Sequence, residues 1–367
     1  MREKIKSWVV TVIFSLTLIC FAFVNIVSPD LEFSKSERRK LKAFPKVTIK
    51  SVLSGDWFDE FEKYTLDQFV LRDFFRGVKA WSRYHLFFQK DNNKIYIANG
   101  NINKMEYPLN EKSVIRGAEK LNKIKEKYFK DKNVFVAVIP DKNYFFAPLN
   151  GSLSFDYEKM EQLIKENIKD ISYIDLFDAM DKDMFYLTDI HWDQEKIIPV
   201  ADLILKTLGR EEKASDFTYE KQKLYPFYGS YYGQAAIKTK PDTLTYLTHA
   251  YLDRATVYDY ETKEYTDIYR PELFEGYDPY DVFLSGARTI LTIENPSNTS
   301  GKELIIFRDS FGSSIAPLLL CGYSKITLVD IRYIPYELLG DRLDFSKDID
   351  VLFLYNTMVF NNSAMLR

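Results

Sequence analysis

The feature that most constrains the fold is an alternation of short apolar runs with helical segments in the last third of the chain. The runs, each the length of one strand, lie at 303–307, 325–330 and 350–355, with helical spacing at 311–321 and 335–339. Upstream, the continuous apolar run Val134–Ile139 is typical of a strand buried on both faces of a parallel sheet. Strands that alternate with helices predict an α/β three-layer sandwich with a mostly parallel sheet.

The remaining segments extend this alternation with less regularity. Helices are expected near 112–129, 156–169 and 194–208, and short strands at 94–97 and 172–176. Residues 54–89 space their aromatic side chains as one or two amphipathic helices do, and we expect these helices to pack on the core. Residues 210–300 are irregular, with strand-like runs at 253–260, 281–284 and 288–293, and predict a β-rich insertion or a second lobe.

The N-terminus indicates a membrane. Basic residues at 2, 4 and 6 precede Trp8–Val27, which carries no charge and is long enough for a helix to cross the bilayer core. The positive flank predicts that the rest of the chain lies outside the cytoplasm. A cleaved signal peptide is the alternative, although no small-x-small cleavage site follows the run. We therefore expect a single-pass cell-membrane protein with an anchor at 1–27, a polar stalk at 28–50 and a catalytic domain at 51–367.

Composition excludes several function classes. The net charge of −3 and the lack of a basic stretch argue against a nucleic-acid partner. Two cysteines and three histidines make a zinc site improbable, so no metal and no soluble cofactor are expected. Cys20 lies in the apolar run and Cys321 far from it, so no disulfide is predicted.

Polar residues follow three of the predicted strands. Asp141 and Lys142 follow the first, Asp309 and Ser310 the second, and Asn356 the last. Open parallel sheets bind ligands at the carboxyl ends of their strands. Ser310 also stands at a predicted helix N-terminus, where N–H groups favour a negative charge on a substrate oxygen. A structural reading is equally available, because Ser and Asp are preferred N-cap residues.

An acid and a histidine stand two residues apart at Asp189 and His191. In an extended segment such residues project to the same side, so the carboxylate can orient the imidazole toward a hydroxyl. The alternative is a structural histidine beside a capping acid, with Trp192 in the core. Together with Ser310, these residues supply the parts of a serine hydrolase or acyltransferase.

The pattern Asp-x-His-Trp at 189–192, followed by Arg308–Leu318, resembles the DHHW family, which is related to the alginate O-acetyltransferase proteins. The segments 67–72, 229–233 and 354–362 resemble it too. The resemblance implies an SGNH-hydrolase-like fold with a permuted motif order.

The resemblance also implies roles for residues. Ser310 would be the nucleophile, His191 the base and Asp189 the orienting acid, while Asp309 would stay outside the triad. The chain departs from the family at Ile190, where a first histidine is expected, and Arg308 stands where ordinary SGNH enzymes carry glycine. Backbone N–H groups of Ser310 and Gly312 are candidates for an oxyanion hole, and the Asn356 side chain is a third.

Aromatic and basic residues near these motifs are candidates for a sugar-binding groove, because a tyrosine offers a flat apolar face and a hydroxyl. These candidates are Trp192, Arg308, Lys142, Tyr231 and Tyr232.

Three functions remain open from the sequence. The first is a membrane-tethered O-acyltransferase that acts on a cell-surface or extracellular polysaccharide. The resemblance implies that the acyl group is acetyl and that a membrane-embedded partner supplies it. The second is a carbohydrate esterase with the same triad, in which water replaces the sugar. The third is a non-catalytic polysaccharide-binding assembly subunit on the same fold.

Overall fold

The computed structural model describes residues 2–34 and 36–367. The chain forms two compact units: the first extends to Gln89 and includes Ala236–Lys238, and the second comprises Lys90–Ala235 and Thr239–Arg367. The sequence placed the start of the catalytic domain at residue 51, whereas in the structure residues 51–89 belong to the first unit.

An eight-stranded sheet forms the centre of the second unit. Five neighbouring strands (β13, β12, β14, β5 and β6) pair in parallel. Three further strands pair antiparallel and extend the sheet beyond β13. In spatial order the strands are β10 (Glu264–Thr266), β9 (Thr256–Asp259), β11 (Ile290–Glu294), β13 (Lys325–Val329), β12 (Glu303–Arg308), β14 (Ile349–Asn356), β5 (Val134–Ile139) and β6 (Ser172–Ile174). The predicted α/β fold with a mostly parallel sheet is confirmed.

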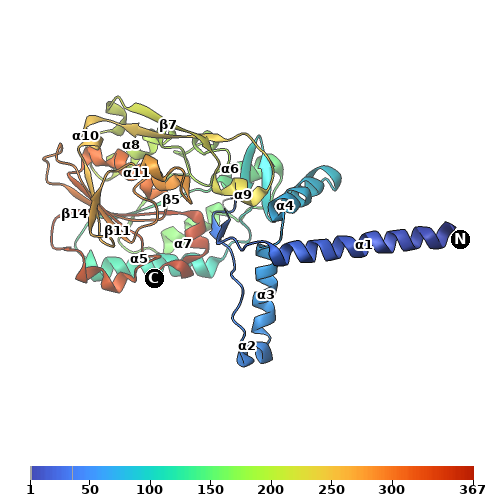
Figure 1. The fold of residues 1–367 in the computed structure, drawn as a ribbon. Helices are drawn as coiled ribbons and strands as arrows, with labels where there is room; N and C mark the ends of the chain where they lie inside the picture. The colour runs from blue at the N-terminus through green and yellow to red at the C-terminus, as the bar shows by residue number, and fades with distance from the viewer. Residues whose placement is uncertain (1, 35) are drawn as a thin grey trace. The chain divides into compact units, whose positions relative to one another are not determined.

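Helices cover both faces of this sheet (Figure 1). On one face, α8 (Ile198–Thr207) and α11 (Gly312–Leu319) pack in a core with Leu304 and Ile306 of β12. On the other face, α5 (Glu111–Tyr128) and α7 (Tyr157–Asn167) pack with Ile305 and Phe307 of the same strand. Successive residues of a strand point to opposite faces, so one apolar run serves both cores and produces three layers.

The irregular middle of the chain contributes to the main sheet. Strands β9, β10 and β11 are its antiparallel edge, so the second half of the predicted insertion belongs to the central layer. The expected strand at 281–284 is wrong: Asp278 caps a 3-10 turn, η6 (Pro279–Val282), in which Pro279 occupies the first position.

The second unit contains further strands, helices and turns outside the main sheet. Two antiparallel pairs stand outside the main sheet: β3 (Ile95–Ala98) with β4 (Asn101–Lys104), and β7 (Glu220–Phe227) with β8 (Asp242–Thr248). The short helices are α6 (Lys142–Asn150), α9 (Ser230–Ala235), α10 (Ala250–Asp253) and α12 (Thr357–Asn361). The 3-10 turns are η2 (Lys182–Met184), η3 (Gln194–Lys196), η4 (Ala214–Asp216), η5 (Pro271–Leu273), η7 (Leu320–Gly322), η8 (Tyr336–Asp341) and η9 (Ser363–Met365).

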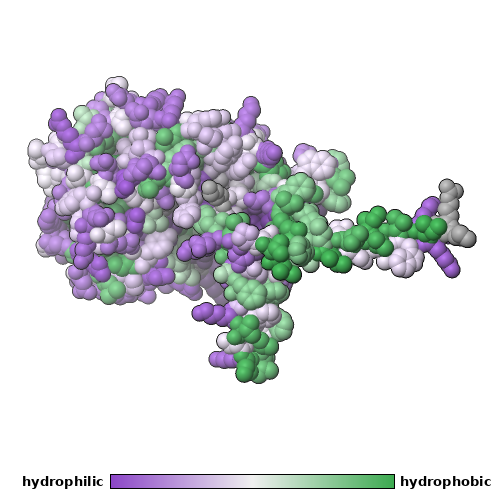
Figure 2. Space-filling view, in the orientation of Figure 1, coloured by the Kyte–Doolittle hydropathy of each residue, from purple (hydrophilic) through white to green (hydrophobic). Residues whose placement is uncertain are grey.

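The first unit starts with α1 (Arg2–Val27), whose segment Glu3–Val27 is long and apolar enough to cross a membrane. After a short pair, β1 (Phe33–Ser34) with β2 (Arg39–Lys40), come α2 (Ile49–Ser54), α3 (Asp56–Asp67), α4 (Arg72–Trp81) and the π-helical turn η1 (Ser82–Leu86). The expected packing of these helices on the core stays a prediction. Helices α2 and α3 bury no residue and α4 buries only Ala80. Apolar side chains remain exposed on them (Figure 2).

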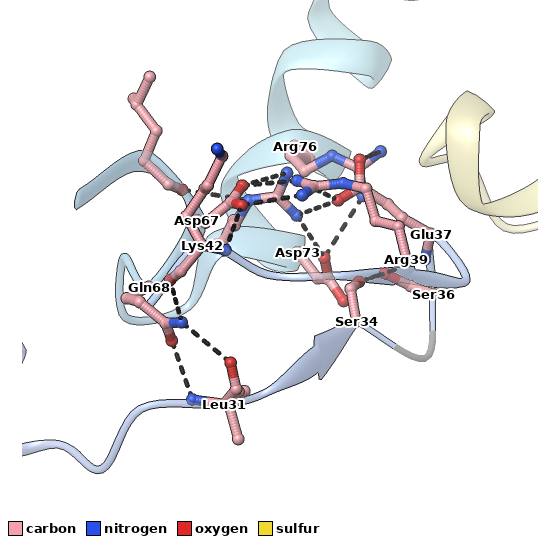
Figure 3. A network of polar contacts seen from close by, with 12 residues as sticks. Leu31, Ser34, Ser36, Glu37, Arg39, Lys42, Asp67, Gln68, Asp73 and Arg76 are labelled. Atoms are coloured by element: carbon pink, nitrogen blue, oxygen red, sulfur yellow. Dashed lines mark hydrogen bonds and ion pairs between the residues drawn. The ribbon is translucent and has the colours of Figure 1, made fainter. Parts of the chain in front are cut away.

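A polar network joins the segment after α1 to α3 and α4 (Figure 3). Arg39 donates to both carboxylate oxygens of Asp67, at 2.8 and 2.5 Å. Glu37 forms ion pairs with Arg72 at 2.6 Å and Arg76 at 3.2 Å. The Gln68 amide exchanges two 2.9 Å hydrogen bonds with the Leu31 backbone. Single exposed ion pairs stabilise little, but a bidentate pair within a network restrains geometry.

The central position of β14 predicts a large effect of truncation there. Leu352→Ala removes a fully buried side chain from the core on the α8 and α11 face of the sheet, and we expect the free energy of unfolding to fall by about 2–5 kcal/mol. Leu338→Ala, which removes the same atoms from a side chain that is 49% exposed, is the matched control. Denaturant titration measures both, and equal effects would contradict the assignment of β14 to the core.

Candidate active site

Ser310 lies in the turn between β12 and α11, at the carboxyl edge of the parallel strands. The buried Asp309 carboxylate holds this turn by accepting from the N–H groups of Phe311 at 3.0 Å and Asn356 at 2.8 Å. Burial raises the pKa of Asp309, because a carboxylate loses its hydration there. Gly312 is required sterically: a Cβ atom at this position would lie 2.6 Å from the Cβ of Arg308.

The structure brings Asp189, His191 and Ser310 into one hydrogen-bonded chain. The Nε2 atom of His191 lies 2.7 Å from the Ser310 hydroxyl oxygen, and its Nδ1 atom lies 2.6 Å from Oδ1 of Asp189. Asp189 is fully buried and His191 is 5% exposed. Because Nδ1 faces a carboxylate, it carries the proton, and Nε2 is free to accept the serine proton. This arrangement can activate a hydroxyl as a nucleophile.

The Asp189 carboxylate is fixed by backbone donors. Its Oδ1 accepts from the His191 N–H at 3.0 Å, and its Oδ2 accepts from the Ser230 N–H at 2.6 Å. The turn before α9 approaches so closely that a Cβ on Gly229 would lie 2.3 Å from the Asp189 Cα. Thr188 is held in turn by Asp242, which accepts from its N–H at 2.8 Å and its hydroxyl at 2.6 Å.

An aromatic ring fixes the plane of the imidazole. Tyr280 stacks on His191 with ring centroids 3.8 Å apart and planes inclined by 7°. The Tyr280 hydroxyl and the Trp192 indole N–H both donate to the Ser314 hydroxyl, at 2.7 and 2.8 Å. Sequence reasoning missed Tyr280, Ser314 and Asp242. Two of them lie in the irregular 210–300 region, where no spacing pattern distinguishes them from other polar residues.

The three candidate donors for an oxyanion hole differ in whether their N–H groups already donate a hydrogen bond within the protein. The Gly312 N–H already donates to the Asp309 carbonyl at 3.1 Å, so the turn itself uses it. The Ser310 N–H has no acceptor within the described part of the chain. The Asn356 Nδ2 group is buried and likewise has no acceptor among residues 2–34 and 36–367, while its Oδ1 accepts from the Met358 N–H. The geometry therefore favours Asn356 and Ser310 over Gly312.

A cavity of about 230 Å³ opens beside the serine. Its polar lining includes Ser310, Asn356, Arg332 and Lys104. Its apolar lining consists of Ile190, Phe311, Met358, Val359 and Met365. Arg332 is oriented by Asp330, which accepts from two of its guanidinium nitrogens at 2.8 and 2.6 Å.

The five candidates for a sugar-binding groove lie elsewhere. Trp192, Arg308, Lys142 and Tyr231 are buried, so their side chains cannot line a surface groove. Arg308 donates to the Ser313 hydroxyl at 3.0 Å and the Gly286 carbonyl at 3.2 Å. Tyr232 is partly exposed and packs on Tyr228, with ring centroids 4.5 Å apart. None of the five lines the cavity beside Ser310.

Lys142 instead supports the segment that carries the acid. Its Nζ lies within hydrogen-bonding distance of four carbonyl oxygens, at 2.7–3.2 Å, in a site that is 1% exposed. These acceptors belong to Ile102, Tyr186, Leu187 and Asp189. Burial lowers the pKa of Lys142 to about 7, and the nearby carboxylates of Asp242 and Asp189 act in the opposite direction.

Lys142→Met would remove the donor that those four carbonyl oxygens share, while the Leu187 oxygen would keep the Ile102 N–H as a second donor at 2.8 Å. We expect the free energy of unfolding to fall by about 1–3 kcal/mol. Above pH 7 the folded lysine loses its proton while the unfolded one keeps it, so the stability of the wild type relative to Lys142→Met should rise with pH from about 7 toward 10. Denaturant titrations across this range measure the difference. Lys240→Met, at an exposed position, is the control, and a pH-independent difference would contradict the buried titration.

Comparison with known proteins finds one family model that matches part of the chain. The family model described as DHHW protein matches residues 151–329, which include Asp189, His191 and Ser310. No protein with a curated description matches the chain.

Solved structures resemble this chain at low sequence identity. A DHHW family protein from Eubacterium siraeum is 22% identical, with a TM-score of 0.62 over 75% of this chain and 95% of that one. Bacillus cereus PatB1 is 16% identical, with a TM-score of 0.59 over 73% of this chain and 97% of that one, and has also been solved with a sulfonyl adduct. The O-acetyltransferase domain of Pseudomonas putida AlgJ is 9% identical, with a TM-score of 0.46 over 74% of this chain and 93% of that one.

The family match falls on the segment that the sequence motifs singled out, and the first two of these structures share the fold. The resemblance of this chain to the DHHW family is therefore confirmed.

Proposed function

We propose that this protein is a serine-dependent O-acyltransferase that transfers an acetyl group to a hydroxyl of a cell-surface or extracellular polysaccharide. The observation that carries the proposal is the continuous chain of short contacts from Asp189 through His191 to Ser310. A structural histidine needs one partner, whereas this one contacts a buried carboxylate with one nitrogen and a hydroxyl with the other.

In the first half-reaction, the Ser310 oxygen attacks the carbonyl carbon of the acyl donor while His191 Nε2 takes the serine proton. Asp189 stabilises the resulting imidazolium. The negative charge on the carbonyl oxygen would be met by the Ser310 N–H and the Asn356 amide, both of which lack an acceptor within the described chain. His191 then returns the proton to the departing group, which leaves an ester on Ser310.

In the second half-reaction, a sugar hydroxyl attacks that ester. His191 Nε2 takes the proton of the hydroxyl, the ester bond to Ser310 breaks, and the proton returns to the serine oxygen. A cavity of about 230 Å³ is below the roughly 300–1,000 Å³ of typical ligand pockets. It suits an acyl group together with the edge of one sugar, and the rest of a polymer would remain outside.

Helix α1 is the basis for the proposed location of the protein. We propose that α1 is a retained single-pass anchor and that the second unit works outside the cytoplasm. Both polysaccharide and a membrane-embedded donor of acyl groups would be available there.

Ser310→Ala should abolish the reaction, because no other hydroxyl lies within reach of His191 Nε2 in the described chain. With 4-nitrophenyl acetate and the full chain in detergent, we expect at least about a 10³-fold loss of nitrophenol release. Ser215→Ala, at an exposed serine, is the matched control and should keep full activity. Equal rates for the wild type and a folded Ser310→Ala would refute the proposal and favour a binding subunit.

Adding an oligosaccharide acceptor separates the two catalytic candidates. Mass spectrometry of an acetylated sugar, dependent on Ser310, supports transfer, while acetate alone identifies an esterase. A sulfonyl fluoride should label Ser310 in the wild type, since sulfonyl groups react with activated serines and PatB1 has been solved with a sulfonyl adduct.

Gly229→Ala tests the positioning of the acid. The new methyl group collides with the Asp189 backbone, so the turn must move and Ser230 withdraws its N–H from the carboxylate. A displacement of about 1 Å should lower kcat by about 10²-fold while KM changes little. Gly77→Ala, where the added Cβ meets only ordinary contacts, is the control. Unchanged kcat for a folded Gly229→Ala would show that the Ser230 contact does not orient Asp189.

A further inference from the structure

Helix α4 carries an apolar stripe that its own unit leaves uncovered. Leu71, Phe74, Phe75, Val78 and Trp81 recur at helical spacing, and their exposed fractions range from 40% to 62%. The turn after α4 continues the stripe with Phe87 and Phe88, which are 64% and 84% exposed. Exposed apolar patches of this kind mark interaction sites on soluble proteins or contacts with lipid.

The opposite side of α4 is polar and occupied. Arg72 and Arg76 lie on it, and both form ion pairs with Glu37 in the network of Figure 3. The helix is therefore amphipathic in the sense of a surface helix, with its polar side already attached to the protein and its apolar side left open.

Helix α3 repeats this design. Its apolar residues Trp57, Phe58 and Phe61 form an aromatic cluster with Phe44, in which Trp57 stacks on Phe61, and Phe58 remains 57% exposed. Figure 2 shows apolar side chains on these helices of the first unit as well as along α1.

The stripe is continuous with the helix that could cross a membrane. Phe21 of α1 contacts Phe69 and Phe75, with ring centroids 5.9 and 6.0 Å apart. Asn25 of α1 accepts from the Val70 N–H at 2.8 Å. In Figure 1, α3 runs across the direction of α1. A helix that follows the bilayer normal would thus place α3 along the membrane surface.

We infer that α3, α4 and residues 87–88 lie in the interfacial layer of the bilayer that α1 enters, with their aromatic side toward the lipid. The inference rests on the proposed retention of α1 as an anchor. Lipid is the occupant that these observations favour, because the stripe joins a membrane-spanning segment without a break. Aromatic residues are also enriched where the headgroups meet the acyl chains. The first unit would then bind the membrane through these surface helices as well as through the single span of α1.

Site-directed spin labelling of the full chain tests this placement. The chain is reconstituted in phosphatidylcholine–phosphatidylglycerol vesicles in a Cys20→Ser background, since Cys321 is buried and escapes labelling. Phe74→Cys and Trp81→Cys report the apolar side of α4, and Asp73→Cys on the polar side of the same helix is the matched control. Collision rates with oxygen, which concentrates in lipid, and with a water-soluble nickel chelate are measured at each site.

We expect positions 74 and 81 to show a severalfold higher ratio of oxygen to nickel collisions than position 73. Equal nickel access at all three sites would place α4 in water and overturn the inference. Protection of 74 and 81 from both reagents would overturn it too, by indicating a protein cover. An intact mass that lacks α1, with the protein released from the vesicles, would also refute it. Ester hydrolysis by the labelled variants is measured separately. Loss of hydrolysis would count against the acyltransferase proposal, whereas the collision ratios alone test the membrane placement.

Discussion

The parallel pairing of β12 with β14, and of β14 with β5, is the constraint on which the site depends. The register sets Arg308 opposite Leu354 and Asn356 opposite Ile139, so three strands end at one edge. Side chains then link those ends: the Thr357 hydroxyl donates to Asp141 at 2.5 Å, and the Asn356 N–H donates to Asp309 at 2.8 Å. Ser310 lies two residues after the end of β12, so this edge sets its position.

Around that edge, buried polar groups are held mostly by backbone partners. Carbonyl oxygens surround Lys142, and N–H groups hold the carboxylates of Asp189 and Asp309. Burying such groups without partners would be costly, and with partners they restrain the backbone. A site assembled in this way needs little reorganisation when charge develops on a substrate, which is the condition that electrostatic catalysis requires.

The two units use aromatic residues for opposite purposes. In the second unit, Tyr280 and Phe311 are buried against His191 and orient it. In the first unit, Phe74 and Trp81 are exposed, and water alone does not explain them. The same amphipathic spacing therefore predicts burial against protein or against lipid equally well. For this reason the spacing in residues 54–89 predicts the helices but not what covers their apolar side.

The sequence by itself determined the parallel sheet, the strand–turn–helix around Ser310 and the pair Asp189 and His191, because these depend on local periodicity and on residues that are close in the chain. Only the tertiary structure decided that His191 meets Ser310, which is 119 residues away, and that Tyr280 stacks on the imidazole. It also decided that Lys142 and Arg308 are buried supports rather than groove residues. Long-range packing sets the burial and the partners of a polar side chain, and no spacing pattern in one sequence records them.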